Sequence, residues 1–256
     1  MDSPSVATAN VEAPVQEPRN VNGGAEGEVH LAGVTRSFGA VRALEGVDLD
    51  VRAGERVAVV GPSGCGKTTL LELVCGLQQP DAGTVSSSPA VLMPQRDGLL
   101  PWLRAIDNAA LAARLAGASR DEARARAHPL FAAFGLEGFE RARPHELSGG
   151  MRQRVAFLRT LLSGKPVLCL DEPFGALDAL TRHEMQEWLA QALAREPRTV
   201  LFVTHDVEEA ARVADRVLVM SPRPGRITAE LAVPPSRTPD ELLSVRERAL
   251  EALRSC

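Results

Sequence analysis

Short apolar runs of strand length alternate along this chain with longer segments of helical spacing. RVAVV at 56–60, VLCL at 167–170 and TVLFVT at 199–204 are continuous apolar runs, typical of strands buried on both faces. Helical spacing follows the first run at 68–77 and precedes the third from about 181 to 195. This alternation predicts an α/β fold.

The N-terminal quarter has a different character. Residues 1–28 are rich in Pro, Ala, Ser, Glu and Gly, so this segment cannot offset the entropy of ordering, and we expect a disordered tail. Residues 30–52 predict two strands joined by a turn. AGTV and AVLMP, beyond the helix at 68–77, are further short strands.

The middle of the chain predicts a second lobe made of helices. Ala- and Arg-rich stretches at 104–117, 120–134 and 137–142 have helical spacing. The C-terminal part returns to strands, RVLVM and RITAELAV, which are joined by the turn SPRPGR and followed by a helix near 238–253.

Composition narrows the class of protein. The chain has 256 residues, 45% hydrophobic and 24% charged, which is an ordinary globular balance, and its net charge of −4 gives no electrostatic case for nucleic acid. No signal peptide opens the sequence and no apolar run approaches the roughly 18 residues of a membrane span, so work at a membrane requires docking to another protein. The four cysteines form no C-x-x-C pair, which favours a reducing cytoplasm.

GPSGCGKTT follows the strand at 56–60 and matches the phosphate-binding pattern G-x-x-x-x-G-K-[ST]. Glycines let backbone N–H groups turn toward phosphate oxygens, and the next helix points its positive end at the same anion. We expect Lys67 to reach the β- and γ-phosphates, Thr68 to bind Mg²⁺ and Thr69 to lie near the α-phosphate. The alternative is a plain Gly-rich turn. The predicted nucleotide loop is Gly61, Pro62, Ser63, Gly64, Cys65, Gly66, Lys67, Thr68 and Thr69.

Cys65 lies inside this loop, at a helix N-terminus and beside Lys67. That setting predicts a lowered thiol pKa and a reactive thiolate covered by nucleotide. The alternative is a small residue whose thiol points inward and is unreactive.

Polar side chains stand where several predicted strands end. Asp171 and Glu172 follow VLCL, Gln95 follows AVLMP, and His205 follows TVLFVT. Ligand sites in α/β folds collect at such strand ends. One of the adjacent carboxylates can hold the Mg²⁺ shell and the other can take a proton from water.

LSGG, at 147–150, precedes the helical run MRQRVAFLRTLL. Ser148 is a candidate helix cap, and Gly149 and Gly150 expose backbone N–H groups to an anion. A simple capped turn explains the pattern equally well when it stands alone.

Two aromatic residues each have two interpretations. Phe38 either stacks on an adenine or closes the core at a strand end. Trp102, in LLPWL just after Gln95, either anchors a partner helix or packs the core of the helical lobe.

Six motifs carry a family resemblance. They are GPSGCGKTT, Gln95, LSGGMRQR, VLCLDEP, GALD and THD. In this order and spacing, over about residues 29–256, they resemble the ATPase subunit of an ABC transporter. LSGGM, GLLPW and VMSPRPGRI are similar to the bacterial importer branch for nitrate, sulfonate, taurine and bicarbonate.

The resemblance implies a P-loop NTPase (RecA-like) core, an antiparallel β subdomain, and an α-helical signature subdomain at about 96–160. It implies ATP and Mg²⁺ as ligands, with Thr68, Gln95 and Asp171 at the metal. Glu172 is implied as the general base, Gln95 as a sensor of Mg²⁺ and the attacking water, and His205 as a γ-phosphate contact. Nucleotide contacts are further implied for Phe38, Ser148, Gly149, Gly150 and Asp178.

Two departures stand out. Most members have Tyr where this chain has Phe38, and Met151 replaces the usual signature Gln. Because Met151 lies beyond the phosphate-facing backbone, we expect no loss of activity from it.

The implied partners are a second copy in an ATP sandwich, a transmembrane permease and, indirectly, a substrate-binding protein, at the cytoplasmic face of the membrane. The implied function is import of a small solute such as an anion. The alternative is a non-transport ABC protein that acts as a regulator or on nucleic acid. Nucleic-acid members that resemble this fold carry long coiled coils or tandem ATPase units, and neither fits in 256 residues.

Overall fold

The computed structural model describes residues 27–175 and 177–255, and of residues 194 and 195 only the backbone. The predicted disordered tail, residues 1–28, therefore lies outside the described residues except for its last two. Gly27 is fixed, because its N–H donates to Ser88 Oγ at 2.9 Å and its carbonyl accepts from Thr199 Oγ1. The described residues thus include two, Glu28 and Gly27, that the prediction assigned to the tail.

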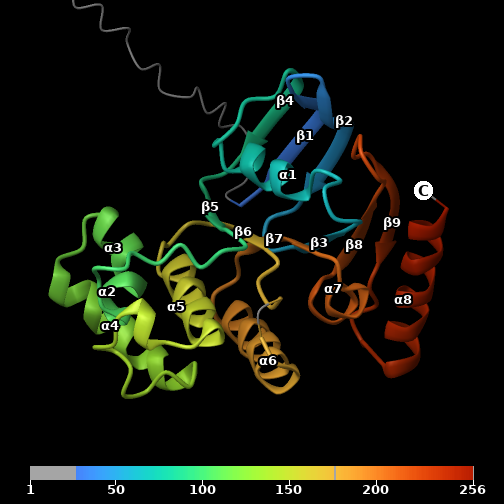
Figure 1. Cartoon of the computed structure of the whole chain (residues 1–256). Coiled ribbons are helices and arrows are strands. Elements are labelled where there is room, and N and C mark those ends of the chain that lie inside the picture. The colour runs from blue at the N-terminus through green and yellow to red at the C-terminus, as the bar shows by residue number, and fades with distance from the viewer. Residues whose placement is uncertain (1–26, 176, 256) are drawn as a thin grey trace, which may run out of the picture.

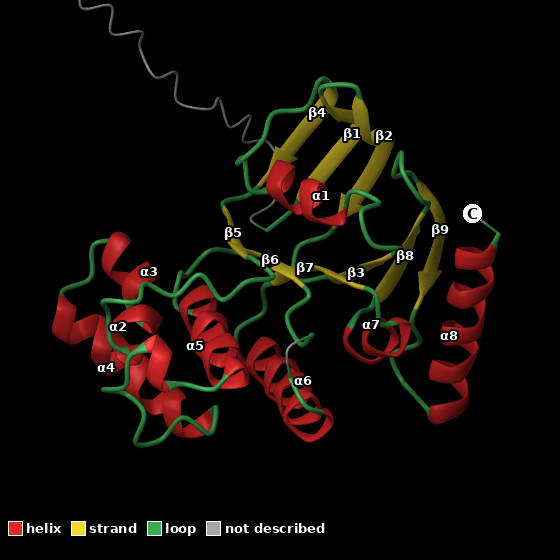
Figure 2. Cartoon of the chain, viewed as in Figure 1, coloured by secondary structure: helices red, strands yellow, loops and turns green. Residues whose placement is uncertain are grey.

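A six-stranded sheet forms the centre of the structure (Figure 2). Its strands are parallel except the last, which runs antiparallel to its neighbour. In spatial order they are β5 (Ala90–Met93), β6 (Val167–Asp171), β7 (Thr199–Thr204), β3 (Arg56–Val60), β8 (Arg216–Met220) and β9 (Ile227–Ala232). Each strand matches a run that the apolar pattern predicts, except that β6 extends one residue further, to Asp171.

A second, antiparallel sheet lies above it and contains β1 (Val29–Phe38), β2 (Val41–Val51) and β4 (Ala82–Ser87), in the order β2-β1-β4. Helix α1 (Lys67–Val74) lies between the two sheets (Figure 2). Leu70 and Leu71 of α1 pack in one apolar core with Leu31 of β1. The antiparallel β subdomain expected from the resemblance is therefore present.

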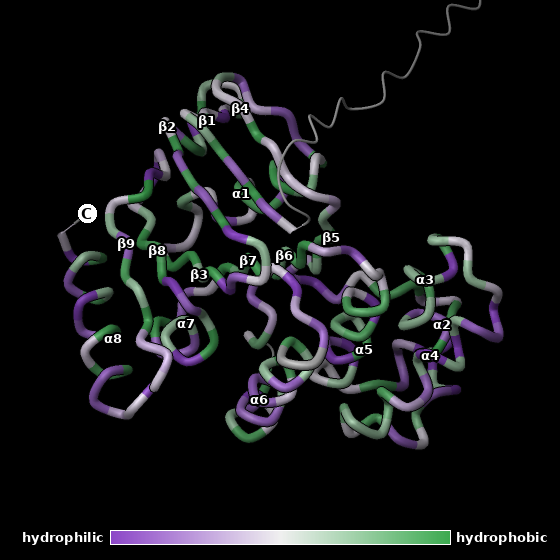
Figure 3. The backbone as a smooth tube through the Cα atoms, turned by 180° about the vertical axis from the view of Figure 1, so that it is seen from behind, coloured by the Kyte–Doolittle hydropathy of each residue, from purple (hydrophilic) through white to green (hydrophobic). Residues whose placement is uncertain are grey.

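Alternation along the central strands gives the molecule two cores. Val57 and Val59 of β3 face the core beneath the antiparallel sheet, whereas Ala58 and Val60 face the core on the helical side. Because both faces of the sheet are covered, the interior positions of these strands are apolar, and Figure 3 shows hydrophobic residues along them.

The helical side is covered by α5 (Gly149–Leu161), α6 (Ala179–Arg195), α7 (Val207–Val213) and α8 (Pro239–Arg254). Figure 1 shows α8 at the β9 end of the sheet, opposite the helical lobe. No helix among the described residues is long and apolar enough to cross a bilayer.

The helical lobe contains α2 (Ala105–Ala109), α3 (Leu111–Leu115) and α4 (Arg120–Ala133), and the short 3₁₀ turn Pro144–Glu146 joins it to α5 (Figure 1). The predicted helix at 104–117 is interrupted at Ala110. The predicted helix at 137–142 is wrong: this stretch forms turns, because Gly138 has φ 86° and six residues are few for a stable helix. The domain boundaries at about 96–160 stay a prediction.

Glu209 is a buried carboxyl in the first turn of α7, close to the end of β7. Its side chain is 5% exposed, and one carboxyl oxygen, Oε1, has no hydrogen-bond partner. Burial raises its pKa to about 7, the charges of Asp206 and Glu172 act in the same direction, and Thr204 and Arg182 oppose the shift. The folded protein is therefore most stable when the Glu209 carboxyl is protonated.

The pH dependence of stability tests this assignment. Between pH 4.5, the ordinary pKa of Glu209, and about 7, the folded protein holds a proton that the unfolded chain releases. The free energy of unfolding should therefore fall as pH rises through this window, by at most about 3 kcal/mol from this group. Glu209→Gln should remove that fall, so the variant gains stability relative to wild type between pH 5 and pH 8 in urea unfolding.

Glu208→Gln is the matched control, because Glu208 is the exposed neighbour on the same helix turn. It should follow the wild-type pH profile. Parallel wild-type and Glu209→Gln profiles would contradict the buried protonated carboxyl.

Candidate functional site

The phosphate-binding motif forms a tight loop between β3 and α1. A Cβ on Gly61 would lie 2.9 Å from both Cys65 Sγ and Met220 O, so the loop accepts only glycine there. Gly66 has φ 109° and caps α1, and a Cβ on it would lie 2.8 Å from Ala43 O. The backbone of the loop is thus packed directly against β2 and β8.

Lys67, the first residue of α1, directly follows this loop and is only 7% exposed. Its ammonium donates to Gly61 O at 2.7 Å and Pro62 O at 2.9 Å. The next residue, Thr68, donates its hydroxyl to Asp171 Oδ2 at 2.8 Å. The loop is therefore linked directly to the end of β6.

Two carboxylates with different environments meet at that end. Asp171 is the last residue of β6, and burial raises its pKa, with Glu172 adding to the shift while Thr68 and Lys67 oppose it. Glu172 has φ 46°, a left-handed conformation that costs of order 1 kcal/mol or more for a non-glycine residue. Strain of this kind collects at functional sites.

Glu172 is held from both sides. Gln95 Nε2 donates to Glu172 Oε2 at 2.9 Å, and His205 Nδ1 lies 3.3 Å from Glu172 Oε1. Gln95 and His205, the other two residues expected to take part in catalysis, thus each contact Glu172. The three residues come from the ends of β5, β6 and β7, as the positions of the strands predict.

A cavity of about 500 Å³ joins Gln95 and Glu172 to the loop, and His205 does not line it. It is lined by Phe38, Val41, Ala43, Ser63, Gly64, Gly66, Lys67, Thr68, Thr69, Gln95, Asp171, Glu172 and Arg223. Phe38 is the last residue of β1 and is 44% exposed, with the Arg36 guanidinium 4.9 Å from its ring centroid. The core interpretation of Phe38 is therefore wrong, and its stacking on a base stays a prediction.

Other predicted residues lie away from this cavity. Ser148 caps α5 by accepting from Met151 N–H at 3.2 Å, and Gly149 follows it on the surface. Asp178 caps α6 through Thr181 N–H at 3.0 Å. Ser148, Gly149, Gly150 and Asp178 do not line the cavity within one copy of the chain.

The expectation of a reactive Cys65 is wrong. Its thiol is 1% exposed, and burial raises its pKa even though the Lys67 ammonium lies 3.8 Å from Sγ and opposes the shift. The reason is orientation: Sγ points inward beneath Gly61, so the helix N-terminus does not act on a solvated thiol. The inward, unreactive alternative is the one that the structure adopts.

Arg223 is a site residue that the sequence pattern does not predict. The pattern assigns it only to the turn SPRPGR, yet its guanidinium lines the cavity and donates to Gly64 O at 3.0 and 2.9 Å. Only a distant contact places it there, so no local sequence signal could have identified it.

The residues present fit Mg²⁺ held together with a nucleotide. Among the described residues, no group of three His, Cys, Asp or Glu side chains gathers that could hold a metal alone. The hydroxyl of Thr68 and the carboxylate of Asp171, 2.8 Å apart, are hard oxygen donors. Mg²⁺ is typically bound by one or two such groups plus substrate phosphates.

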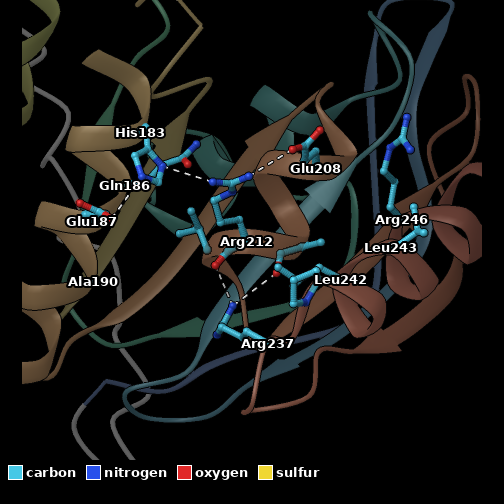
Figure 4. A pocket seen from close by; sticks show the side chains of 13 residues that line it. His183, Gln186, Glu187, Ala190, Glu208, Arg212, Arg237, Leu242, Leu243 and Arg246 are labelled. Atoms are coloured by element: carbon cyan, nitrogen blue, oxygen red, sulfur yellow. Dashed lines mark hydrogen bonds and ion pairs between the residues drawn. The ribbon is translucent and has the colours of Figure 1, made fainter. Parts of the chain in front are cut away.

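A larger cavity, of about 640 Å³, lies between α6, α7 and α8 (Figure 4). Its polar groups are largely paired with each other: Arg212 contacts His183 and Glu208, and Arg237 donates to Arg212 O (Figure 4). The phosphate-binding motif and the carboxylates at the end of β6 line the smaller cavity instead, so that cavity is the candidate site.

Comparison with known proteins agrees with this geometry. The profile of the ABC transporter family matches residues 44–175. The aliphatic sulfonates import ATP-binding protein SsuB 1 of Rhodococcus jostii (strain RHA1) is 46% identical over 214 residues, which cover 81% of this chain and 84% of that protein. The taurine import ATP-binding protein TauB of Burkholderia pseudomallei (strain K96243) is 45% identical over 204 residues, covering 76% and 78%.

Solved structures share the fold. A dimeric post-hydrolysis state of the ATP-binding cassette MJ0796, bound to ADP and Pi, matches with a TM-score of 0.75 and 29% identity, covering 80% of this chain and 99% of that one. A second dimeric structure of MJ0796, described as a bacterial ABC transporter cassette, gives a TM-score of 0.74 at the same identity and coverage. The chain therefore belongs to the ABC transporter family, as an ATP-binding ATPase subunit similar to those of sulfonate and taurine importers.

Proposed function

We propose that this chain is the ATP-hydrolysing motor of an importer for small sulfonate-type anions, with Glu172 as its general base. The observation that carries the proposal is the position of Glu172, which contacts Gln95 and His205 at the mouth of the phosphate-binding loop. A carboxylate fixed on both oxygens is pre-oriented toward a water molecule above the loop.

The chemistry is transfer of the γ-phosphoryl group of ATP to water. The water oxygen forms a bond to phosphorus while the bond to the ADP oxygen breaks, and Glu172 accepts the water proton. Lys67 and the loop N–H groups offset the phosphate charge, and His205 orients the reacting groups. Thr68 and Asp171 would hold Mg²⁺, which supplies further charge neutralisation when it is bound.

We further propose that each site is completed by a second copy. Ser148 and the glycines after it form an anion-ready helix N-terminus that lies outside the cavity of its own chain. In a head-to-tail dimer, Ser148 of one copy would cap the γ-phosphate held by Lys67 of the other, with Asp178 near the interface. The dimeric structures of the MJ0796 cassette support this arrangement.

Trp102 is proposed to anchor the permease. Its side chain does not pack in the core of the helical lobe, because the residue is 68% exposed. The loop that presents it is rigid, because the buried Asn108 side chain accepts from Leu100 N–H at 2.8 Å and donates to Leu100 O at 3.1 Å and Leu103 O at 3.3 Å. A rigid, exposed aromatic side chain is typical of a binding hot spot.

The cargo is proposed from the relatives, whose names state import of aliphatic sulfonates and taurine. Nitrate and bicarbonate are the other anions of the branch that the sequence resembles. Such a motor would work as a peripheral protein at the cytoplasmic face, with a substrate-binding protein choosing the solute. The import function of these relatives favours the motor over a regulator or a nucleic-acid enzyme.

The catalytic role of Glu172 is tested by Glu172→Gln. The amide keeps the size of the side chain but cannot accept the proton, so turnover should fall about 10²- to 10⁴-fold while ATP binding remains. Phosphate release and equilibrium ATP binding measure the two effects. Glu208→Gln, an exposed carboxylate on α7, is the matched control and should hydrolyse ATP at the wild-type rate. Near-normal turnover by Glu172→Gln would rule out this base.

The docking role of Trp102 is tested by Trp102→Ala. Because the side chain is exposed, the melting temperature and basal ATPase rate should stay at wild-type values, while copurification with the coexpressed permease is lost. Leu115→Ala is the control, since Leu115 is 82% exposed elsewhere on the same lobe and should assemble normally. Assembly of Trp102→Ala at the wild-type level, or its unfolding, would contradict the docking role.

A further inference from the structure

The turn between β8 and β9 forms part of the nucleotide cavity. Residues 221–226 leave the end of β8 and run beside β2, where Gly225 N–H donates to Ala43 O at 2.9 Å and Glu45 N–H donates to Gly225 O at 3.1 Å. The turn is thus held by backbone hydrogen bonds to a strand of the other sheet.

Gly225 brings the turn into contact with the phosphate-binding loop. A Cβ on Gly225 would lie 2.1 Å from Cys65 O and 3.0 Å from Met220 Sδ. Only glycine allows the two backbones to approach this closely. The loop is therefore enclosed by its own strand, by β2 and by this turn.

The same turn places Arg223 on the loop backbone. The guanidinium donates from Nε and Nη2 to Gly64 O at 3.0 and 2.9 Å. Gly64 has φ 76°, so this peptide adopts a left-handed conformation that the two bonds hold in place. The third nitrogen, Nη1, makes no hydrogen bond among the described residues and belongs to a side chain that lines the cavity.

The charged side chains that line the cavity indicate that Arg223 can bind phosphate. Among the residues that line it, Asp171 and Glu172 are the carboxylates, and Lys67 and Arg223 are the cations. Without Arg223, one ammonium would face two carboxylates and an incoming polyphosphate. A guanidinium is always charged, and its geometry matches phosphate oxygens.

We propose that Arg223 is a nucleotide-binding residue, which fixes the Gly64 peptide of the loop and binds the polyphosphate of the nucleotide through its free Nη1. This rests on the proposed function, because it requires that the loop hold a nucleotide. It adds a phosphate contact from outside the loop, on a segment about 160 residues further along the chain.

Arg223→Gln tests the proposal, because glutamine can keep one hydrogen bond to Gly64 O but loses the charge. We expect ADP and ATP to bind about tenfold more weakly, with most of the kinetic loss appearing in the KM for ATP. Arg223→Lys keeps the charge and should weaken binding by only about threefold. Equilibrium binding of ADP and ATP to the full-length protein and steady-state ATPase kinetics measure these effects.

Arg226→Gln is the matched control. Arg226 lies on the same turn and is exposed, but it pairs with Glu45 and does not line the cavity. It should bind both nucleotides as the wild type does. The affinity of wild type should also fall more steeply with salt than that of Arg223→Gln, which a merely structural role would not produce.

Equal affinities of Arg223→Gln and wild type for ADP and ATP would overturn the proposal. So would an equal loss in Arg223→Gln and Arg226→Gln, or salt dependences that run parallel, since both point to the integrity of the turn alone. Failure of the wild type itself to bind ATP would instead refute the proposed function.

Discussion

Parallel pairing of β6, β7 and β3 is the constraint on which the whole site depends. In this register, Asp171 lies opposite Val203, and Val60 lies opposite Thr204. The three strands therefore end at one level, and the residues that follow them meet at one edge. Glu172, His205 and the phosphate-binding loop come from positions 172, 205 and 61–69, yet they form one site because the strands that carry them are neighbours.

Because these strands end at one edge, charged side chains of both signs lie close together in the site. The site holds two carboxylates, one of them buried with a raised pKa, next to a buried ammonium. Each is satisfied by a specific partner: Thr68 for Asp171, Gln95 and His205 for Glu172, and backbone carbonyls for Lys67. Such groups are costly to bury alone. The network therefore holds the residues proposed for catalysis in place and keeps the charged groups paired.

Much of this could be predicted from sequence, because the central strands are covered on both faces and their apolar runs are unambiguous. The strand ends then locate Gln95, Asp171, Glu172 and His205 without any knowledge of side-chain positions. The features that could not be predicted depend on the direction in which a side chain points or on a contact between residues far apart in the sequence. Cys65 points inward, Trp102 points outward, and Arg223 reaches the loop only because Gly225 lets two backbones touch. The predicted helix at 137–142 does not form, because Gly138, inside this short segment, adopts a left-handed conformation.

The most direct test of the central claim, a site shared by two copies, is the mass of the Glu172→Gln protein in sedimentation velocity with and without saturating Mg-ATP. Because this variant does not hydrolyse the ATP held between the two copies, the dimer should not dissociate. The protein should therefore sediment as a dimer with Mg-ATP and as a monomer without it. Ser148→Arg in the same background should bind ATP but stay monomeric, because the added side chain would clash at the shared phosphate. A Glu172→Gln protein that stays monomeric at saturating Mg-ATP and high protein concentration would contradict the account.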